Sequence, residues 1–151
     1  MQGLKDKLIV ALDVDTLREA KRFVDILYPE VKIFKVGSQL FTVCGPEAVK
    51  MIGKKGAKVF LDLKLHDIPN TVAKAVESAR DLGVYMLTVH TFGGREMLRA
   101  AVEATKGANG PLVIGVTLLT SLDKKILKEF GIIRLLTSEV IALAKIAKDE
   151  G

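Results

Sequence analysis

The feature that most constrains the fold of this chain is a regular alternation of short apolar runs with longer amphipathic stretches. The short runs are rich in β-branched residues and predict strands at 8–14, 32–40, 57–64, 85–93 and 111–120. The longer stretches have apolar residues at helical spacing and predict helices at 16–29, 45–56, 69–83, 94–107, 121–131 and 137–151. Five successive βα units predict a parallel sheet covered by helices.

Two architectures contain such a sheet: a doubly wound open sheet and a (β/α)₈ barrel of the TIM type. A dinucleotide-binding open sheet has a glycine-rich turn after its first strand, whereas the segment LDVDTLREAK (12–21) contains no glycine. We therefore expect a TIM-barrel type fold, represented by about five βα units in a single domain over residues 1–151. A complete barrel typically needs about 200–250 residues, so the chain is expected to stop before the sixth strand.

Composition limits the kinds of ligand that the protein is expected to bind and the cell compartment in which it is expected to lie. The formal charge of +5 comes from Lys and Arg spread along the chain, which favours a small anionic ligand over nucleic acid. The single Cys44 excludes an intrachain disulfide and suits the cytoplasm. No signal peptide is recognisable, and no segment approaches the roughly 18 apolar residues of a membrane span. We expect a cytoplasmic protein without a membrane partner.

Charged residues gather in the segment FLDLKLHDIPNT (60–71), where the neighbouring side chains are apolar. Because side chains alternate along a strand, Asp62 and Lys64 are expected on one face of the third strand. Lys35 on the second strand and Asp13 after the first are expected to point into the same cavity. Active sites of parallel α/β folds lie at these carboxyl ends of strands. The alternative is a set of ordinary ion pairs at strand ends.

Other polar residues carry weaker signals. Asp67 follows the third strand and is either a functional residue or the N-cap of the next helix. We interpret His66 as a structural residue, whereas His90, on the same strand face as Thr88, either lines the cavity or is a core histidine. The two His and one Cys are scattered and predict no zinc site. No Walker loop or GxSxG motif is present, and nothing indicates a cofactor.

The segment DLKLHDIPNT (62–71) resembles the Asp-x-Lys-x-x-Asp-Ile-Pro-x-Thr signature of the orotidine 5′-phosphate decarboxylase family. The segments LIVALDVD, KVG and VHTFGG resemble the family's preceding and following strand ends, in the same order, so the resemblance covers essentially the whole chain. Two related groups, 3-keto-L-gulonate 6-phosphate decarboxylase and hexulose-phosphate synthase, share the Asp-x-Lys-x-x-Asp core. They usually have an acid where this chain has Lys35, so Lys35 and DIPNT favour the pyrimidine enzyme.

The resemblance implies decarboxylation of orotidine 5′-phosphate to uridine 5′-phosphate in pyrimidine biosynthesis, without a metal or a cofactor. It implies that Lys64 donates a proton to C6 of the pyrimidine and that Asp62 lies beside the substrate carboxylate. It also implies that Lys35 bridges this aspartate and the ribose, and that Asp13 binds a ribose hydroxyl.

The same resemblance implies a homodimer in which Asp67 and Thr71 reach the neighbouring subunit's site. Ser121, or alternatively Thr120, would bind the pyrimidine edge. In the family the loops after strands seven and eight grip the 5′-phosphate, and this chain is expected to lack them. Two other functions stay open: a sugar-phosphate decarboxylase or aldolase that holds Mg²⁺ on Asp62, and a non-catalytic barrel fragment that self-associates through open sheet edges.

Overall fold

The structure is a computed structural model that describes residues 7–107 and 109–151. Its strands are β1 (Ile9–Ala11), β2 (Ile33–Gly37), β3 (Lys58–Leu65), β4 (Met86–His90) and β5 (Leu112–Val116). Its helices are α1 (Leu17–Leu27), α2 (Ser38–Cys44), α3 (Pro46–Lys54), α4 (Pro69–Asp81), the 3₁₀ turn η2 (Thr91–Gly93), α5 (Gly94–Ala104), α6 (Lys124–Glu129) and α7 (Leu136–Glu150). None of the helices in these two ranges is long and apolar enough to cross a membrane.

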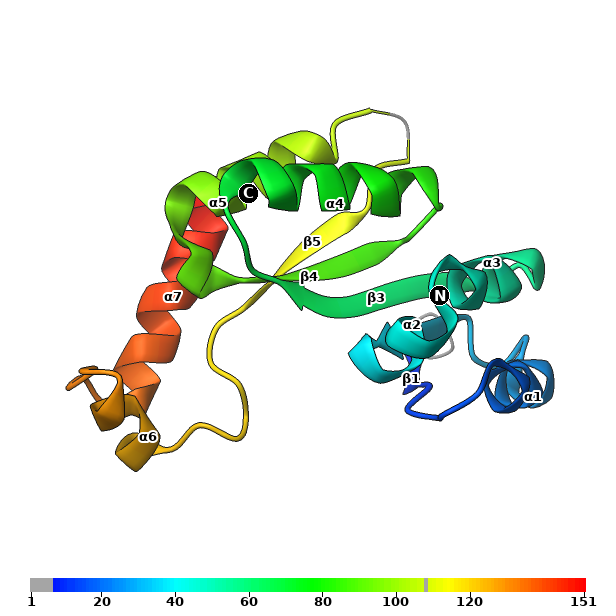
Figure 1. The fold of residues 1–151 in the computed structure, drawn as a ribbon, viewed down its shortest axis with the longest axis horizontal. Helices are drawn as coiled ribbons and strands as arrows, with labels where there is room; N and C mark the ends of the chain where they lie inside the picture. Colours follow the sequence, from blue (N-terminus) through cyan, green and yellow to red (C-terminus); the bar gives the residue numbers. More distant parts are fainter. Residues whose placement is uncertain (1–6, 108) are drawn as a thin grey trace.

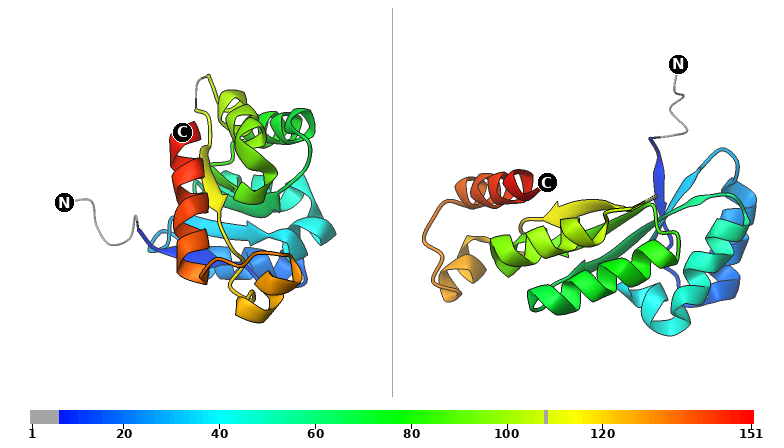
Figure 2. Two further views of the ribbon diagram at one scale, coloured as in Figure 1. Left: turned by 90° about the vertical axis from the view of Figure 1, so that its left-hand side faces the viewer. Right: turned by 90° about the horizontal axis from the view of Figure 1, so that it is seen from above.

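The five strands form one parallel sheet in the order β1-β2-β3-β4-β5, so each strand pairs with its neighbours along the chain (Figure 1). Ile9 pairs with Ile33 and Met86 pairs with Leu112, which fixes the register at the two ends of the sheet. Helices α4 and α5 cover one face of the central strands (Figures 1 and 2). The predicted parallel sheet with alternating helices is therefore confirmed.

Local signals in the sequence explain where the helices begin. The Thr16 side chain accepts a hydrogen bond from the Glu19 N–H, and its hydroxyl donates to the Glu19 carboxylate, so this pair closes the first turn of α1. Helices α3 and α4 both begin at a proline, which needs no hydrogen bond partner for its nitrogen at that position. Ala20 and Val24 then bury one stripe of α1 in the hydrophobic core.

Several predicted boundaries are wrong. The strand predicted at 32–40 ends at Gly37, because Ser38–Cys44 forms the short helix α2. The strands predicted at 8–14, 85–93 and 111–120 and the helix predicted at 121–131 are all shorter in the structure. Helix α6 begins only after Asp123, whose Oδ1 accepts hydrogen bonds from two backbone N–H groups of the first turn. Apolar runs show where a strand is buried but not where its pairing ends.

Helix α7 packs beside α5 and against strand β5. A Cβ atom on Gly115 of β5 would lie 2.8 Å from Ala147 Cβ in α7 and 3.1 Å from Thr91 Cγ2, so a glycine permits this close approach. At the far end of α7, Arg95 of α5 contacts Glu150 at 2.9 Å and Asp149 at 3.0 Å. These contacts fix the last helix against the body of the protein.

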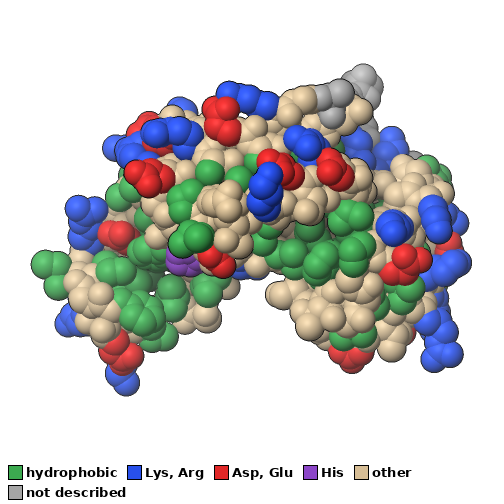
Figure 3. All heavy atoms as spheres, turned by 45° about the horizontal axis from the view of Figure 1, so that its top comes forward, with side chains coloured by type: hydrophobic (Ala, Val, Ile, Leu, Met, Phe, Trp, Pro, Cys, Tyr) green, Lys and Arg blue, Asp and Glu red, His purple; other side chains and the backbone are tan. Residues whose placement is uncertain are grey.

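Strands β1 and β5 are the two open edges of the sheet. Apolar side chains on both edges are exposed, including Ile9 on β1 and Leu112 on β5, which is 53% exposed. The lobe that carries α6 and the beginning of α7 also shows gathered hydrophobic side chains, and a hollow separates it from the part around α1 (Figures 1 and 3). Such exposed apolar surface is typical of a surface that another polypeptide covers.

Candidate active site

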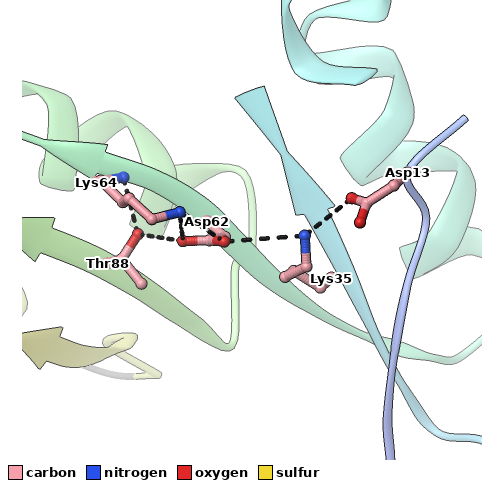
Figure 4. A network of polar contacts seen from close by, with 5 residues as sticks. All are labelled: Asp13, Lys35, Asp62, Lys64 and Thr88. Carbon is pink, nitrogen blue, oxygen red and sulfur yellow. Dashed lines mark hydrogen bonds and ion pairs between the residues drawn. The ribbon is translucent and has the colours of Figure 1, made fainter. Parts of the chain in front are cut away.

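Three neighbouring strands bring four charged side chains into one row. Lys35 Nζ in β2 lies 3.0 Å from Asp13 Oδ1, just after β1, and 3.8 Å from Asp62 Oδ2 in β3. Lys64 Nζ donates to both oxygens of Asp62, at 2.9 Å and 3.0 Å (Figure 4). The order along the row is therefore carboxylate, ammonium, carboxylate, ammonium. The predicted convergence of these four residues is observed.

The row is most buried in its middle, at Lys35 and Asp62, and more exposed at its two ends. The side chain of Asp13 is 62% exposed at one end, whereas that of Asp62 is only 15% exposed between the two lysines. Burial of a carboxylate is costly without partners, and Asp62 has two ammonium groups and a hydroxyl around it. Fixed charges of both signs at a strand end can stabilise charge that develops on a bound substrate.

Lys64 has an unusual backbone conformation. Its φ is 51°, in the left-handed region that a residue with a Cβ atom rarely adopts and that costs on the order of 1 kcal/mol or more. The pairing of β3 with β4 shifts register here, between Leu61 and Leu65. Bulges of this kind often lie next to active sites, where they redirect a side chain.

Thr88 of β4 belongs to the same network, although sequence reasoning did not select it as a site residue. It is 3% exposed, its hydroxyl oxygen accepts a hydrogen bond from the Lys64 N–H at 2.8 Å, and the hydroxyl donates to Asp62 Oδ1 at 2.9 Å (Figure 4). The available signal was its position on the strand face that carries His90. A threonine in a strand is so common that this signal did not distinguish a functional residue.

The remaining predicted residues lie outside this row. Asp67 is exposed in the turn before α4 and its Oδ1 accepts a hydrogen bond from the Ile68 N–H at 2.7 Å. The N-cap of α4 is Ile68, so the interpretation of Asp67 as that cap is wrong. Thr71 is exposed in the first turn of α4, and Thr120 and Ser121 are exposed in the loop between β5 and α6.

Three aromatic rings stack beside the end of β4. The His90 ring lies 5.4 Å from the His66 ring and 5.4 Å from the Phe92 ring, measured between centroids, and its Nδ1 accepts a hydrogen bond from the Phe92 N–H at 3.4 Å. These rings line a hollow of about 560 Å³ whose other walls are apolar: Leu119, Leu122, Leu127, Phe130 and Ile132. His66 is thus part of a defined contact, and His90 lines an apolar hollow that includes no member of the charged row.

The stability of the protein is expected to depend on the protonation of His90. Burial, together with the positive charges of His66 and Lys64, lowers the pKa of His90 below its usual value of about 6.5. The unfolded chain then binds more protons in mild acid than the folded chain does. The free energy of unfolding is therefore expected to fall as the pH drops below about 6.5, toward the lowered pKa of the folded state.

Urea unfolding at about pH 7.5 and about pH 5.5 measures this dependence. His90→Phe keeps an aromatic ring in the stack but cannot titrate, so its stability should fall less over the same range. An equal loss of stability in wild type and His90→Phe would contradict the assignment to His90.

In residues 7–107 and 109–151, no group of three or more His, Cys, Asp and Glu side chains could hold a metal ion.

Comparisons with known proteins agree on one family. Residues 6–151 match the model of the Orotidine 5′-phosphate decarboxylase / HUMPS family. The chain is 50% identical over 147 residues to orotidine 5′-phosphate decarboxylase of Legionella pneumophila (strain Paris). The matched region covers 96% of this chain and 64% of the relative. It is 47% identical over 147 residues to the protein of the same name from Vibrio cholerae serotype O1 (strain ATCC 39541), with the same two shares covered.

The crystal structure of orotidine 5′-phosphate decarboxylase from Lactobacillus acidophilus is similar with a TM-score of 0.88 at 36% identity, covering 95% of this chain and 67% of that chain. The chain thus spans 64% of the length of the two curated relatives.

Proposed function

Because residues 6–151 belong to the Orotidine 5′-phosphate decarboxylase / HUMPS family, we propose that the protein decarboxylates orotidine 5′-phosphate to uridine 5′-phosphate. The fold is of the (β/α)₈ TIM-barrel type, represented by five βα units. The observation that carries the proposal is the alternating row of Asp13, Lys35, Asp62 and Lys64 at the carboxyl ends of β1, β2 and β3.

Lys64 is the proposed proton donor. In the reaction the bond between C6 and the carboxylate breaks, CO₂ leaves, and its bonding electron pair remains on C6. The Lys64 ammonium then gives one proton to C6, which yields the neutral pyrimidine ring and leaves a neutral amine. An ammonium group fixed by Asp62 at 2.9 Å meets this negative charge without solvent reorganisation.

The other three members of the row bind the substrate and orient its reacting end. Asp62, between the two lysines, would lie beside the substrate carboxylate, where repulsion favours loss of CO₂. Lys35 bonds Asp13 and faces Asp62, so its ammonium can bridge the reacting end and the ribose. Asp13 is the most exposed member of the row, which suits a ligand for a ribose hydroxyl. This chemistry requires no metal ion or organic cofactor.

Lys35 supports the pyrimidine substrate over a sugar phosphate. A sugar-phosphate decarboxylase or aldolase of the same family would use Asp62 to hold Mg²⁺. In this chain the Lys35 ammonium, 3.8 Å from Asp62 Oδ2, already provides positive charge next to that carboxylate. We therefore expect a reaction that does not depend on a divalent cation.

An assay of absorbance loss from orotidine 5′-phosphate, with and without EDTA, tests the proposed function. Turnover that EDTA does not change supports it. Turnover of a sugar phosphate that EDTA abolishes would support the magnesium-dependent alternative. If neither orotidine 5′-phosphate nor a sugar phosphate is turned over, while sedimentation shows that the chain self-associates, a non-catalytic protein would be favoured.

We also propose that the active protein is a cytoplasmic homodimer. Asp67 and Thr71 are exposed at the beginning of α4, outside the charged row, which fits residues that act in the neighbouring subunit's site. Ser121, or alternatively Thr120, would supply a hydroxyl to the pyrimidine edge from the loop after β5.

Mixed dimers provide a direct test of Asp67. Asp67→Asn and Lys64→Ala chains, each nearly inactive alone, are expected to recover about a quarter of wild-type activity when mixed in equal amounts. Half of the dimers are then mixed, and one of the two sites in each contains both intact residues. Differently tagged chains verify that subunits exchange. Exchange without recovered activity would show that Asp67 acts in its own subunit or only supports the turn.

A further inference from the structure

We infer that Thr88 is a positioning residue that holds Lys64 and Asp62 in their working arrangement. The inference follows from how β3 and β4 pair, and only its kinetic part depends on the proposed function.

The strands β3 and β4 pair unevenly around Thr88. Leu61 pairs with Leu87, and the next pair is Leu65 with Val89. Between these pairs β3 has three residues where β4 has only Thr88, so the ladder of backbone hydrogen bonds is interrupted. A buried N–H group that leaves such a ladder needs another partner.

The Thr88 hydroxyl fills this interruption with two hydrogen bonds. Its oxygen accepts a hydrogen bond from the Lys64 N–H at 2.8 Å, and the hydroxyl donates a hydrogen bond to Asp62 Oδ1 at 2.9 Å. The same Asp62 oxygen accepts from Lys64 Nζ at 2.9 Å. One side chain thus fixes the backbone of the lysine and the carboxylate that its ammonium contacts.

The arrangement does more than give a buried N–H group a partner, because the same hydroxyl also bonds the carboxylate that contacts the Lys64 ammonium. A threonine that only favours strand structure has no need to bond two residues of the neighbouring strand across a bulge. The Lys64 backbone has a φ of 51°, which is unfavourable for a residue with a side chain, and the bond to Thr88 stabilises this conformation. Without that bond, β3 can relax toward regular pairing and turn the ammonium away from the substrate.

Thr91 offers a matched control. It is 1% exposed, close to the 3% of Thr88, and its hydroxyl also makes a buried hydrogen bond, to the Val116 carbonyl at 2.9 Å. That bond involves neither Lys64 nor Asp62. Thr91→Val therefore removes a buried hydroxyl of the same kind without touching the charged row.

The experiment compares the 151-residue chain as wild type, Thr88→Val, Thr88→Ser and Thr91→Val. Hydrogen exchange of the Lys64 amide, followed by NMR, is expected to become about tenfold faster in Thr88→Val, because one hydrogen bond is lost. Thr88→Ser, which keeps the hydroxyl, should restore protection, and Thr91→Val should leave Lys64 exchange unchanged. Equal exchange in Thr88→Val and wild type would overturn the inference.

Kinetics on orotidine 5′-phosphate provide the second readout. They are measured with the chain completed by the last third of a family relative, because the chain alone is expected to turn over substrate only weakly. Thr88→Val is expected to lower kcat about tenfold to a hundredfold with KM within about twofold, since the misplaced group acts in the transition state. Thr88→Ser should recover most of kcat, and Thr91→Val should keep it. A kcat of Thr91→Val as low as that of Thr88→Val would overturn the kinetic part. Lack of turnover in the completed wild-type protein would count against the proposed function, while the Lys64 exchange would still decide whether Thr88 positions this residue.

Discussion

Turnover of orotidine 5′-phosphate is expected to rise at least about 100-fold when the 151-residue chain is mixed with a polypeptide that supplies the last third of a relative. The chain spans 64% of the Legionella pneumophila relative at 50% identity, so the remaining part of that protein is a suitable complement. Its βα units would pair with the open edges at β1 and β5 and close the sheet. The resemblance to the family also places the phosphate-gripping loops in this part, and their binding energy helps to bring the reacting end into place.

The chain alone is expected to self-associate and to turn over substrate only weakly. Ile9 on one edge and Leu112 on the other are exposed, and unpaired apolar edges of this kind recruit other strands. Analytical ultracentrifugation of the chain, the complement and the mixture measures assembly beside activity. The first third of the same relative serves as a control polypeptide that should not activate. A stable monomer of the 151-residue chain with full activity would contradict both expectations.

Lys64→Ala in this two-part assembly is expected to lower kcat by a factor of about 10²–10³ while the fold persists. The substitution removes the ammonium that contacts both Asp62 oxygens, and no other group in the row can replace its proton at that place. Turnover is measured by absorbance and folding by urea unfolding.

Lys58→Ala is the matched control, because Lys58 lies in the same strand but its ammonium contacts the Tyr85 ring at 4.2 Å. This variant should keep kcat within about twofold, although it loses the contact between cation and ring. Near-normal turnover in folded Lys64→Ala would refute the assignment of Lys64 as proton donor.

The sequence predicted which four charged residues meet, because side-chain alternation and parallel strand pairing can both be inferred from sequence. Alternation along β3 places Asp62 and Lys64 on one face, and parallel pairing aligns the ends of β1, β2 and β3. The observed contacts of Lys35 with Asp13 and with Asp62 follow from these two rules. The roles of these residues in the reaction stay predictions.

What the sequence did not predict depends on geometry between strands. Thr88 acquires its importance from the bulge opposite it, and Lys64 has a backbone conformation that its residue type disfavours. The strand predicted at 32–40 failed for a similar reason. The segment Ser38–Cys44 contains β-branched and aromatic residues, yet it forms α2 with Leu40 buried, because tertiary packing outweighs a weak local propensity.

The order of the strands in the sheet also determines how the protein can fold. Since each strand pairs only with strands next to it in sequence, every pairing closes a short segment of chain and the contact order stays low for a parallel sheet. A ribosome synthesises the chain from its N-terminus at roughly 5–20 residues per second, so β1 and β2 emerge before β5 is synthesised. Folding can therefore proceed during translation, as each βα unit that leaves the ribosome adds its strand to the growing edge of the sheet.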